Sequence, residues 1–134
     1  MRPAPPRPDL LRRPAGAFGW LDARLLHERW LGELGPDATA VLVLLALAAD
    51  RHGASFYGRG RMATLLGLAP DAVDRALNRL RLLGLVDHRP WRPGHPDGVW
   101  QLLPVPRRTR KRGPPQRLGD LLAGLGFAGE TIER

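Results

Sequence analysis

The sequence predicts a mainly α domain that carries one small β-hairpin, which is an α+β fold. Apolar residues recur at helical spacing in four segments between residues 21 and 83. Two short β-prone segments follow, with a Pro- and Gly-rich loop between them. A chain of 134 residues suits one domain with a single hydrophobic core.

The first two predicted helices span residues 21–34 and 37–50. Leucines and Trp30 follow one broad face of the first helix, and Gly35-Pro36 breaks the chain before the second. The second helix contains the most apolar run of the chain, which is far shorter than the roughly 20 residues that a bilayer span requires. We therefore expect a helix buried on most sides and no contact with a membrane.

The second half of the domain alternates short elements with turns. In chain order we predict an extended segment, a short helix, a longer helix and two strands, over residues 55–57, 60–66, 70–83, 85–89 and 99–103. Gly67 and Gly84 lie just after the two helices, where a left-handed residue commonly ends a helix. The loop over 90–98 makes the two strands a hairpin with a long tip.

The charge of the chain is concentrated in its flanks. Lys and Arg number 21 against 13 Asp and Glu, a net charge of +8 with neutral histidines. Residues 1–17 carry +3 and residues 107–117 carry +6, whereas the globular domain over 18–106 carries only +1. We therefore predict a basic N-terminal arm, the domain, a basic linker and a short C-terminal helix over 118–134. This balance favours an acidic partner such as nucleic acid.

The residue inventory argues against an enzyme. The chain has no cysteine, which excludes disulfides, thiolate metal sites and cysteine nucleophiles. The only lysine, Lys111, follows no phosphate-loop motif, and the only serine, Ser55, lies outside a nucleophile motif. His88, His95 and Asp97 share the hairpin, but their spacing matches no metal motif. We expect no catalysis, cofactor or metal and, without the apolar stretch of a signal peptide, a cytoplasmic, nucleoid-associated location.

Two short helices joined by a glycine-containing turn describe a helix-turn-helix unit. The small, glycine and β-branched positions of such units are occupied by Ala63, Gly67 and Val73, and the accompanying apolar positions by Met62, Leu66 and Leu68. With the run ATLLGLAPDAVDRALNRLRLLGLV, residues 36–103 resemble winged helix-turn-helix domains, such as those of plasmid and phage replication initiators and small bacterial regulators. The resemblance implies binding to double-stranded DNA, as a transcriptional regulator or as a replication initiator or accessory protein of a mobile element.

The helix over 70–83 carries polar residues opposite an apolar stripe. The stripe, at the spacing of an inward face, consists of Val73, Ala76, Leu77 and Leu80. The candidates for base contacts in a major groove are Arg75, Asn78 and Arg79. Asp71 and Asp74 count against this hypothesis because phosphates would repel them, and exposed arginines are often only solvated.

Other basic residues are candidates for contacts with phosphates or a minor groove. The hairpin, which the resemblance makes a wing, carries Arg89, Arg92 and His95. The short helix begins with Arg59 and Arg61. The basic linker adds sequence-independent affinity through Arg107, Arg108, Arg110, Lys111 and Arg112. Each of these residues also has the plainer interpretation of a solvated surface charge.

Two partner hypotheses concern proteins. The C-terminal segment has helical spacing at Leu118, Leu121, Leu122 and Leu125 and would dock on the core or on a partner protein. A homodimer could form through the first helix, where Trp30 and its leucines exceed what one core covers. The alternative function is therefore a winged-helix module for protein–protein interaction, without sequence-specific reading of DNA.

Overall fold

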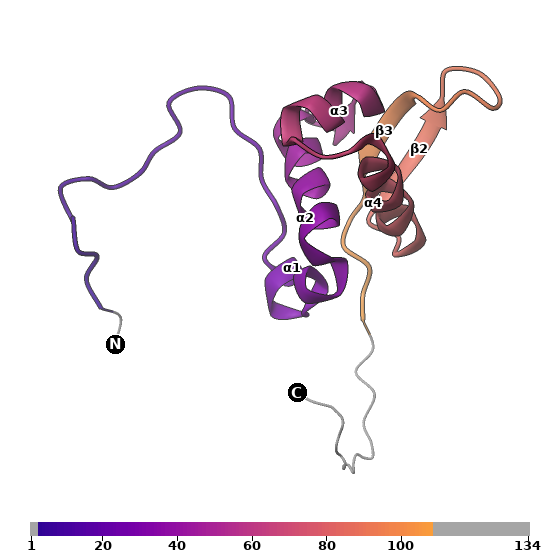
Figure 1. The fold of residues 1–134 in the computed structure, drawn as a ribbon. Coiled ribbons are helices and arrows are strands. Elements are labelled where there is room, and N and C mark those ends of the chain that lie inside the picture. The colour runs from indigo at the N-terminus through magenta and orange to yellow at the C-terminus, as the bar shows by residue number, and fades with distance from the viewer. Residues whose placement is uncertain (1–2, 109–134) are drawn as a thin grey trace, which may run out of the picture.

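The computed structural model describes residues 3–108 (Figure 1). Within them the chain forms four helices and one three-stranded antiparallel sheet. In chain order the elements are α1 (Arg24–His27), α2 (Trp30–Ala48), β1 (Ala54–Ser55), α3 (Arg59–Leu66), α4 (Pro70–Leu82), β2 (Val86–Pro90) and β3 (Gly98–Leu102). The predicted α+β class, mainly helical with one hairpin, is confirmed.

The start of the domain differs from the single helix predicted over 21–34. Arg29 adopts a left-handed conformation (φ 64°), which separates the four-residue α1 from a new helix beginning at Trp30. The predicted break at Gly35-Pro36 is confirmed, because Gly35 (φ 80°, ψ 174°) is not helical and divides α2 into two parts, the second of which begins at Pro36. The prediction of a single helix over 21–34 was wrong because a left-handed arginine is uncommon and no local sequence signal marks it.

α2 is the central helix, and it contacts α1, α3, α4 and the sheet. Most of its apolar run is buried, as predicted, although Val43 and Leu47 remain 39% and 66% exposed. Trp30 is only 4% exposed and belongs to the same core. The expectation that Trp30 lies on a homodimer surface is therefore wrong, whereas the homodimer itself stays a prediction.

α3 and α4 are joined by a tight turn at Gly67, which is left-handed (φ 66°, ψ 33°). The N–H of Leu68 donates to the carbonyl of Ala63 (3.0 Å), the hydrogen bond of a Schellman motif. Pro70 then begins α4. The buried face of α4 contains the whole predicted stripe and consists of Ala72, Val73, Ala76, Leu77 and Leu80.

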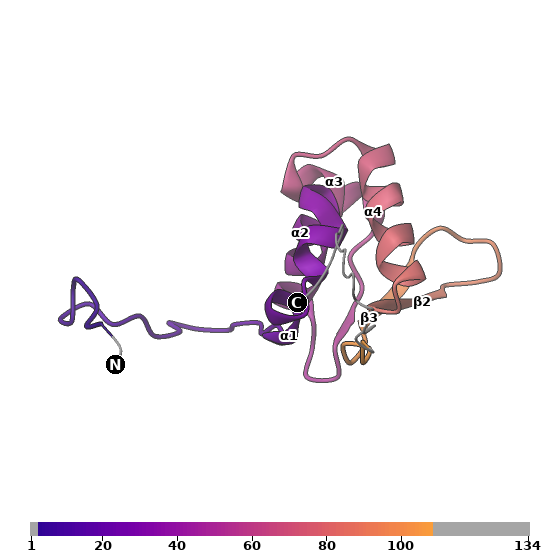
Figure 2. The same cartoon turned by 90° about the horizontal axis from the view of Figure 1, so that it is seen from below.

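The sheet has the strand order β1-β3-β2, so β3 lies in the middle. Ser55 and His88 both pair with Trp100, which places these three side chains on one face. Ser55 and Trp100 are 1% and 4% exposed, and this inner face packs toward the helices. Figure 2 shows that the loop between β2 and β3 reaches outward beyond α4, on the side away from α2.

Gly98 lies against the backbone of β2, and we expect Gly98→Ala to loosen the hairpin. A Cβ at this position would lie 2.6 Å from the Cα of Pro90 and would overlap the carbonyl of Arg89. The free energy of unfolding, measured in urea by circular dichroism, should fall by roughly 1–3 kcal/mol or more.

Gly60→Ala is the matched control for this prediction. Gly60 lies in the first turn of α3, and a Cβ there would meet no atom within 4 Å. This change should stabilise the protein by roughly 0.4–1 kcal/mol, because alanine restricts the unfolded chain. Equal effects of the two substitutions would contradict the close approach of β3 to β2.

Candidate nucleic-acid interface

α4 exposes one face, opposite the stripe that packs on α2. With about 100° between successive residues, the most outward positions are Asp71, Arg75, Asn78 and Leu82. All four are exposed, Leu82 to 78%. α3 and the hairpin flank this helix, so the exposed face is framed by two further elements (Figure 1).

The three residues predicted to contact bases do not form one group. Arg79 donates from Nε and Nη2 to the carbonyl oxygen of Glu33 (3.2 and 2.7 Å), which anchors α4 to α2 near its kink. Arg75 and Asn78 are exposed and make no side-chain hydrogen bond or ion pair within the described residues. These two remain available to a ligand, whereas the guanidinium of Arg79 is already engaged.

A groove of about 440 Å³ separates α4 from the hairpin. α4 contributes Asp74, Leu77, Asn78 and Arg81 to its walls. The sheet and the hairpin loop contribute, among others, His88, His95 and Trp100. The groove thus brings together three predicted residues from separate elements, namely Arg59, Asn78 and His95.

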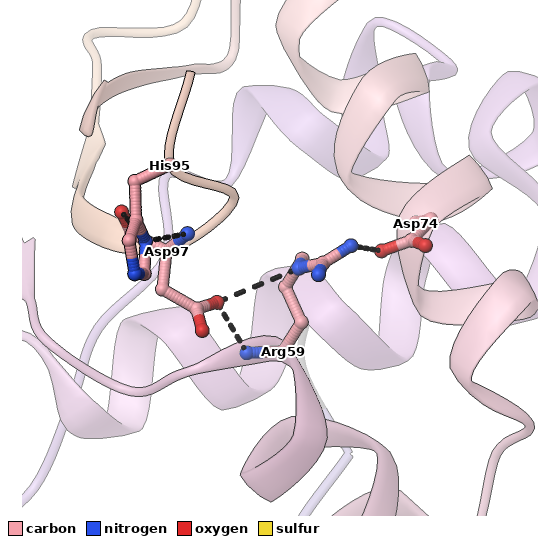
Figure 3. A network of polar contacts seen from close by, with 4 residues as sticks. All are labelled: Arg59, Asp74, His95 and Asp97. Carbon is pink, nitrogen blue, oxygen red and sulfur yellow. Dashed lines mark hydrogen bonds and ion pairs between the residues drawn. The ribbon is translucent and has the colours of Figure 1, made fainter. Parts of the chain in front are cut away.

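Arg59, at the start of α3, connects α4 and the hairpin loop (Figure 3). Its Nη1 lies 2.5 Å from Oδ1 of Asp74, and its Nε lies 3.5 Å from Oδ1 of Asp97. The backbone N–H of Arg59 also donates to Oδ1 of Asp97 (3.0 Å), which satisfies a free donor at the beginning of α3. The predicted repulsion between Asp74 and phosphates is therefore reduced, because Arg59 neutralises this carboxylate.

The hairpin loop is folded on itself around Asp97. The N–H of Asp97 donates to Nδ1 of His95 (3.0 Å), and its carbonyl accepts from the N–H of Trp91 (3.1 Å). Since Nδ1 accepts, a neutral His95 carries its proton on Nε2. Arg89 and Arg92 are exposed, as expected for residues that could contact a ligand.

His88 lies on the inner face of the sheet and stacks on Trp100, with ring centroids 4.1 Å apart and planes at 14°. Burial lowers its pKa below the ordinary value of 6.5, and the positive charge of Arg81 lowers this pKa further. A backbone hydrogen bond with Asp97 and the charges of Asp97 and Asp87 act in the opposite direction. His88 therefore presents a mainly neutral ring to the groove at pH 7, beside the exposed Arg81.

The remaining predicted contact residues lie in different places. The guanidinium of Arg61 lies over the ring of Tyr57, 4.3 Å from its centroid. Arg108 covers the ring of Trp30 at 3.6 Å, pairs with Glu33 and donates to the carbonyl of Glu28 (3.1 Å). It therefore sits at the α1–α2 junction, not beside the hairpin loop. Arg107 is exposed, and the other predicted linker and C-terminal residues, namely Arg110, Lys111, Arg112, Leu118, Leu121, Leu122 and Leu125, lie outside the described residues.

The structure adds residues that the sequence did not single out. Arg81 lines the groove three residues after Asn78, a position that helical spacing could have placed on the same side of α4. Phe56 and Trp91 form a stacked, exposed pair. They are 35 positions apart, and no local pattern connects them.

Comparisons of the chain with protein-family models, with curated proteins and with solved structures found no match. The candidate interface is therefore described from the residues of this chain alone. These are two free polar side chains on α4, a groove lined by Arg81, His88 and His95, and a hairpin loop with exposed arginines.

Lowering the pH from about 7.5 to about 5.5 should destabilise the protein through His88. The pKa of His88 is depressed in the folded state, so the unfolded chain binds more protons below pH 6.5 and folding stability falls as the pH decreases. His88→Phe keeps a ring on Trp100 and should reduce the loss of Tm, measured by circular dichroism across this range. An unchanged pH dependence in this variant would contradict the role of His88.

Proposed function

We propose that the protein binds double-stranded DNA as a winged helix-turn-helix protein, with α4 in the major groove and the β2–β3 hairpin as the wing. One observation carries this proposal. Arg75 and Asn78 project, unengaged within the described residues, from an exposed helix face beside a groove whose opposite wall is the hairpin. The element order, with α3, a glycine turn, α4 and then the hairpin, supports the family resemblance.

The geometry of B-form DNA supports this placement. The major groove is about 12 Å wide and admits an α-helix, and a sugar-phosphate strand separates it from the neighbouring minor groove. If α4 enters the major groove and the loop tip approaches the minor groove, that strand passes over the groove between α4 and the hairpin. Arg81 and His95 then face its phosphates.

The outward face of α4 offers the chemistry of base recognition. Arginine can pair bidentately with guanine, asparagine with adenine, and a carboxylate can accept from cytosine N4. Arg75, Asn78 and Asp71 supply these three groups on one face. We therefore expect a sequence preference in addition to general attraction to phosphates. Such binding suits a transcriptional regulator or a replication initiator or accessory protein of a mobile element.

A second function, a winged-helix module that binds another protein, is favoured by one specific observation. Leu82 is 78% exposed at the last turn of α4, on the same outward face as Arg75. A large apolar side chain at this position suits a protein surface better than a phosphate backbone. Selection of duplexes from a random library at near-physiological salt separates the two functions, because the protein-binding module would enrich no sequence.

Arg75→Ala should weaken binding to the selected duplex by roughly 5- to 150-fold, equivalent to about 1–3 kcal/mol for a bidentate base contact. Fluorescence anisotropy titrations at near-physiological salt measure this loss. Asn78→Ala should relax the preference at one base position in a repeated selection, because its contacts go to a single base.

The matched control is Arg29→Asn at the α1–α2 junction. This change removes the same charge, and asparagine tolerates the left-handed conformation that Arg29 adopts. We expect near wild-type affinity for the selected duplex. Similar losses in Arg29→Asn and Arg75→Ala would mean that total charge, not a base contact, determines binding.

Deleting residues 109–117 removes four positive charges and keeps Arg108 on Trp30. The slope of log affinity against log salt should become shallower by up to roughly 3–4, because each phosphate contact contributes about 0.9. The enriched sequence should stay the same. A deletion variant that lost its sequence preference would show that the linker, not α4, reads the bases.

A further inference from the structure

Two exposed aromatic rings lie together on the outer side of the sheet. Phe56 follows β1 and Trp91 follows β2, and their rings are nearly parallel, with planes at 7° and centroids 6.2 Å apart. The two residues are 61% and 56% exposed. Exposure of one large aromatic residue is ordinary, but two stacked rings from separate elements form a preorganised flat surface.

The register places this pair on the face opposite the groove. Ser55 and His88 pair with Trp100 on the inner face, so the residues after them point outward. Arg89 pairs with Val99 on this outer face, two residues before Trp91. Trp91 lies just beyond β2, and its ring stacks on that of Phe56, which directly follows Ser55. The pair therefore lies on the face of the sheet that carries Arg89, and neither ring lines the groove beside α4.

Two arginines of the hairpin, Arg89 and Arg92, lie within two residues of Trp91, and Asp97, which accepts the N–H of Trp91, is itself paired with Arg59. Arg89 and Arg92 are exposed and form no ion pair within the described residues. The acid on the outer face of β2 is Asp87, four residues before Trp91, and it pairs with Gln101 at the other end of the ladder. Flat aromatic rings beside unpaired arginines complement the faces of nucleobases and the phosphates that connect them.

We propose that Phe56 and Trp91 stack unpaired bases of single-stranded DNA, with Arg89 and Arg92 on the adjoining phosphates. A base within a duplex cannot offer its face to these rings, because its neighbours in the stack cover it. The surface therefore selects unpaired strands without reading their sequence, since every base has a π face. This binding goes beyond the proposed duplex function and uses the opposite face of the hairpin.

Trp91→Ala and Phe56→Leu test the proposal on the full chain. The probe is a fluorescein-labelled oligo-dT of about 15 nucleotides, titrated by anisotropy at near-physiological salt. We expect Trp91→Ala to weaken binding roughly 5- to 150-fold, the loss typical of one stacked base, and Phe56→Leu to weaken it less. Trp91→Phe should restore most of the affinity, because it restores a ring.

Trp20→Ala is the matched control, because Trp20 is 77% exposed in the N-terminal segment and should leave oligo-dT binding unchanged. Arg75→Ala should reduce duplex binding and spare oligo-dT binding, which separates this inference from the proposed function. The inference is overturned if the wild type does not bind oligo-dT, or if Trp91→Ala matches Trp20→Ala. It is also overturned if Trp91→Ala reduces duplex affinity equally, or if it converts a dimer to a monomer in light scattering.

Discussion

Burial of one stripe of α4 against α2 determines which side chains the protein can offer to a ligand. Val73 and Leu80 are fully buried, and the rigid spacing of a helix then directs Arg75 and Asn78 outward. The hydrogen bonds from Arg79 to a carbonyl near the kink of α2 reinforce this packing at its edge. Core packing thus divides the polar residues of α4 into those that anchor the helix and those that remain free.

The hairpin loop is positioned by polar contacts in addition to the core. Gly58, which precedes α3, has no side chain to cap the helix, and the carboxylate of Asp97 from the hairpin loop accepts the N–H of Arg59 instead. Arg59 in turn pairs with Asp74 of α4. Such partly exposed pairs add little stability, but they fix orientation. Arg59 therefore links α3, α4 and the hairpin loop at one residue, in addition to the core that they share.

The sequence predicted what local patterns determine. The stripe of α4, the turn at Gly67 and both hairpin strands follow from spacing and turn chemistry, and the structure confirms them. The local sequence patterns could not predict the left-handed Arg29 or the burial of Trp30, because both result from tertiary packing. The same holds for the candidate site. The exposure of Arg75 and Asn78 was predictable from helical spacing, whereas the hydrogen bonds of Arg79 go to a carbonyl 46 positions away, which no local pattern indicates.

The two faces of the hairpin connect the two proposals. Because side chains alternate along β2, His88 faces the groove beside α4 while Arg89 faces the aromatic pair. A protein that holds a duplex at α4 would present Phe56 and Trp91 to DNA beyond the hairpin. A transcriptional regulator gains little from a surface for unpaired bases, whereas a replication initiator acts where a duplex opens. Stacking of unpaired bases beside a duplex-binding helix would therefore favour the replication role over the regulatory one.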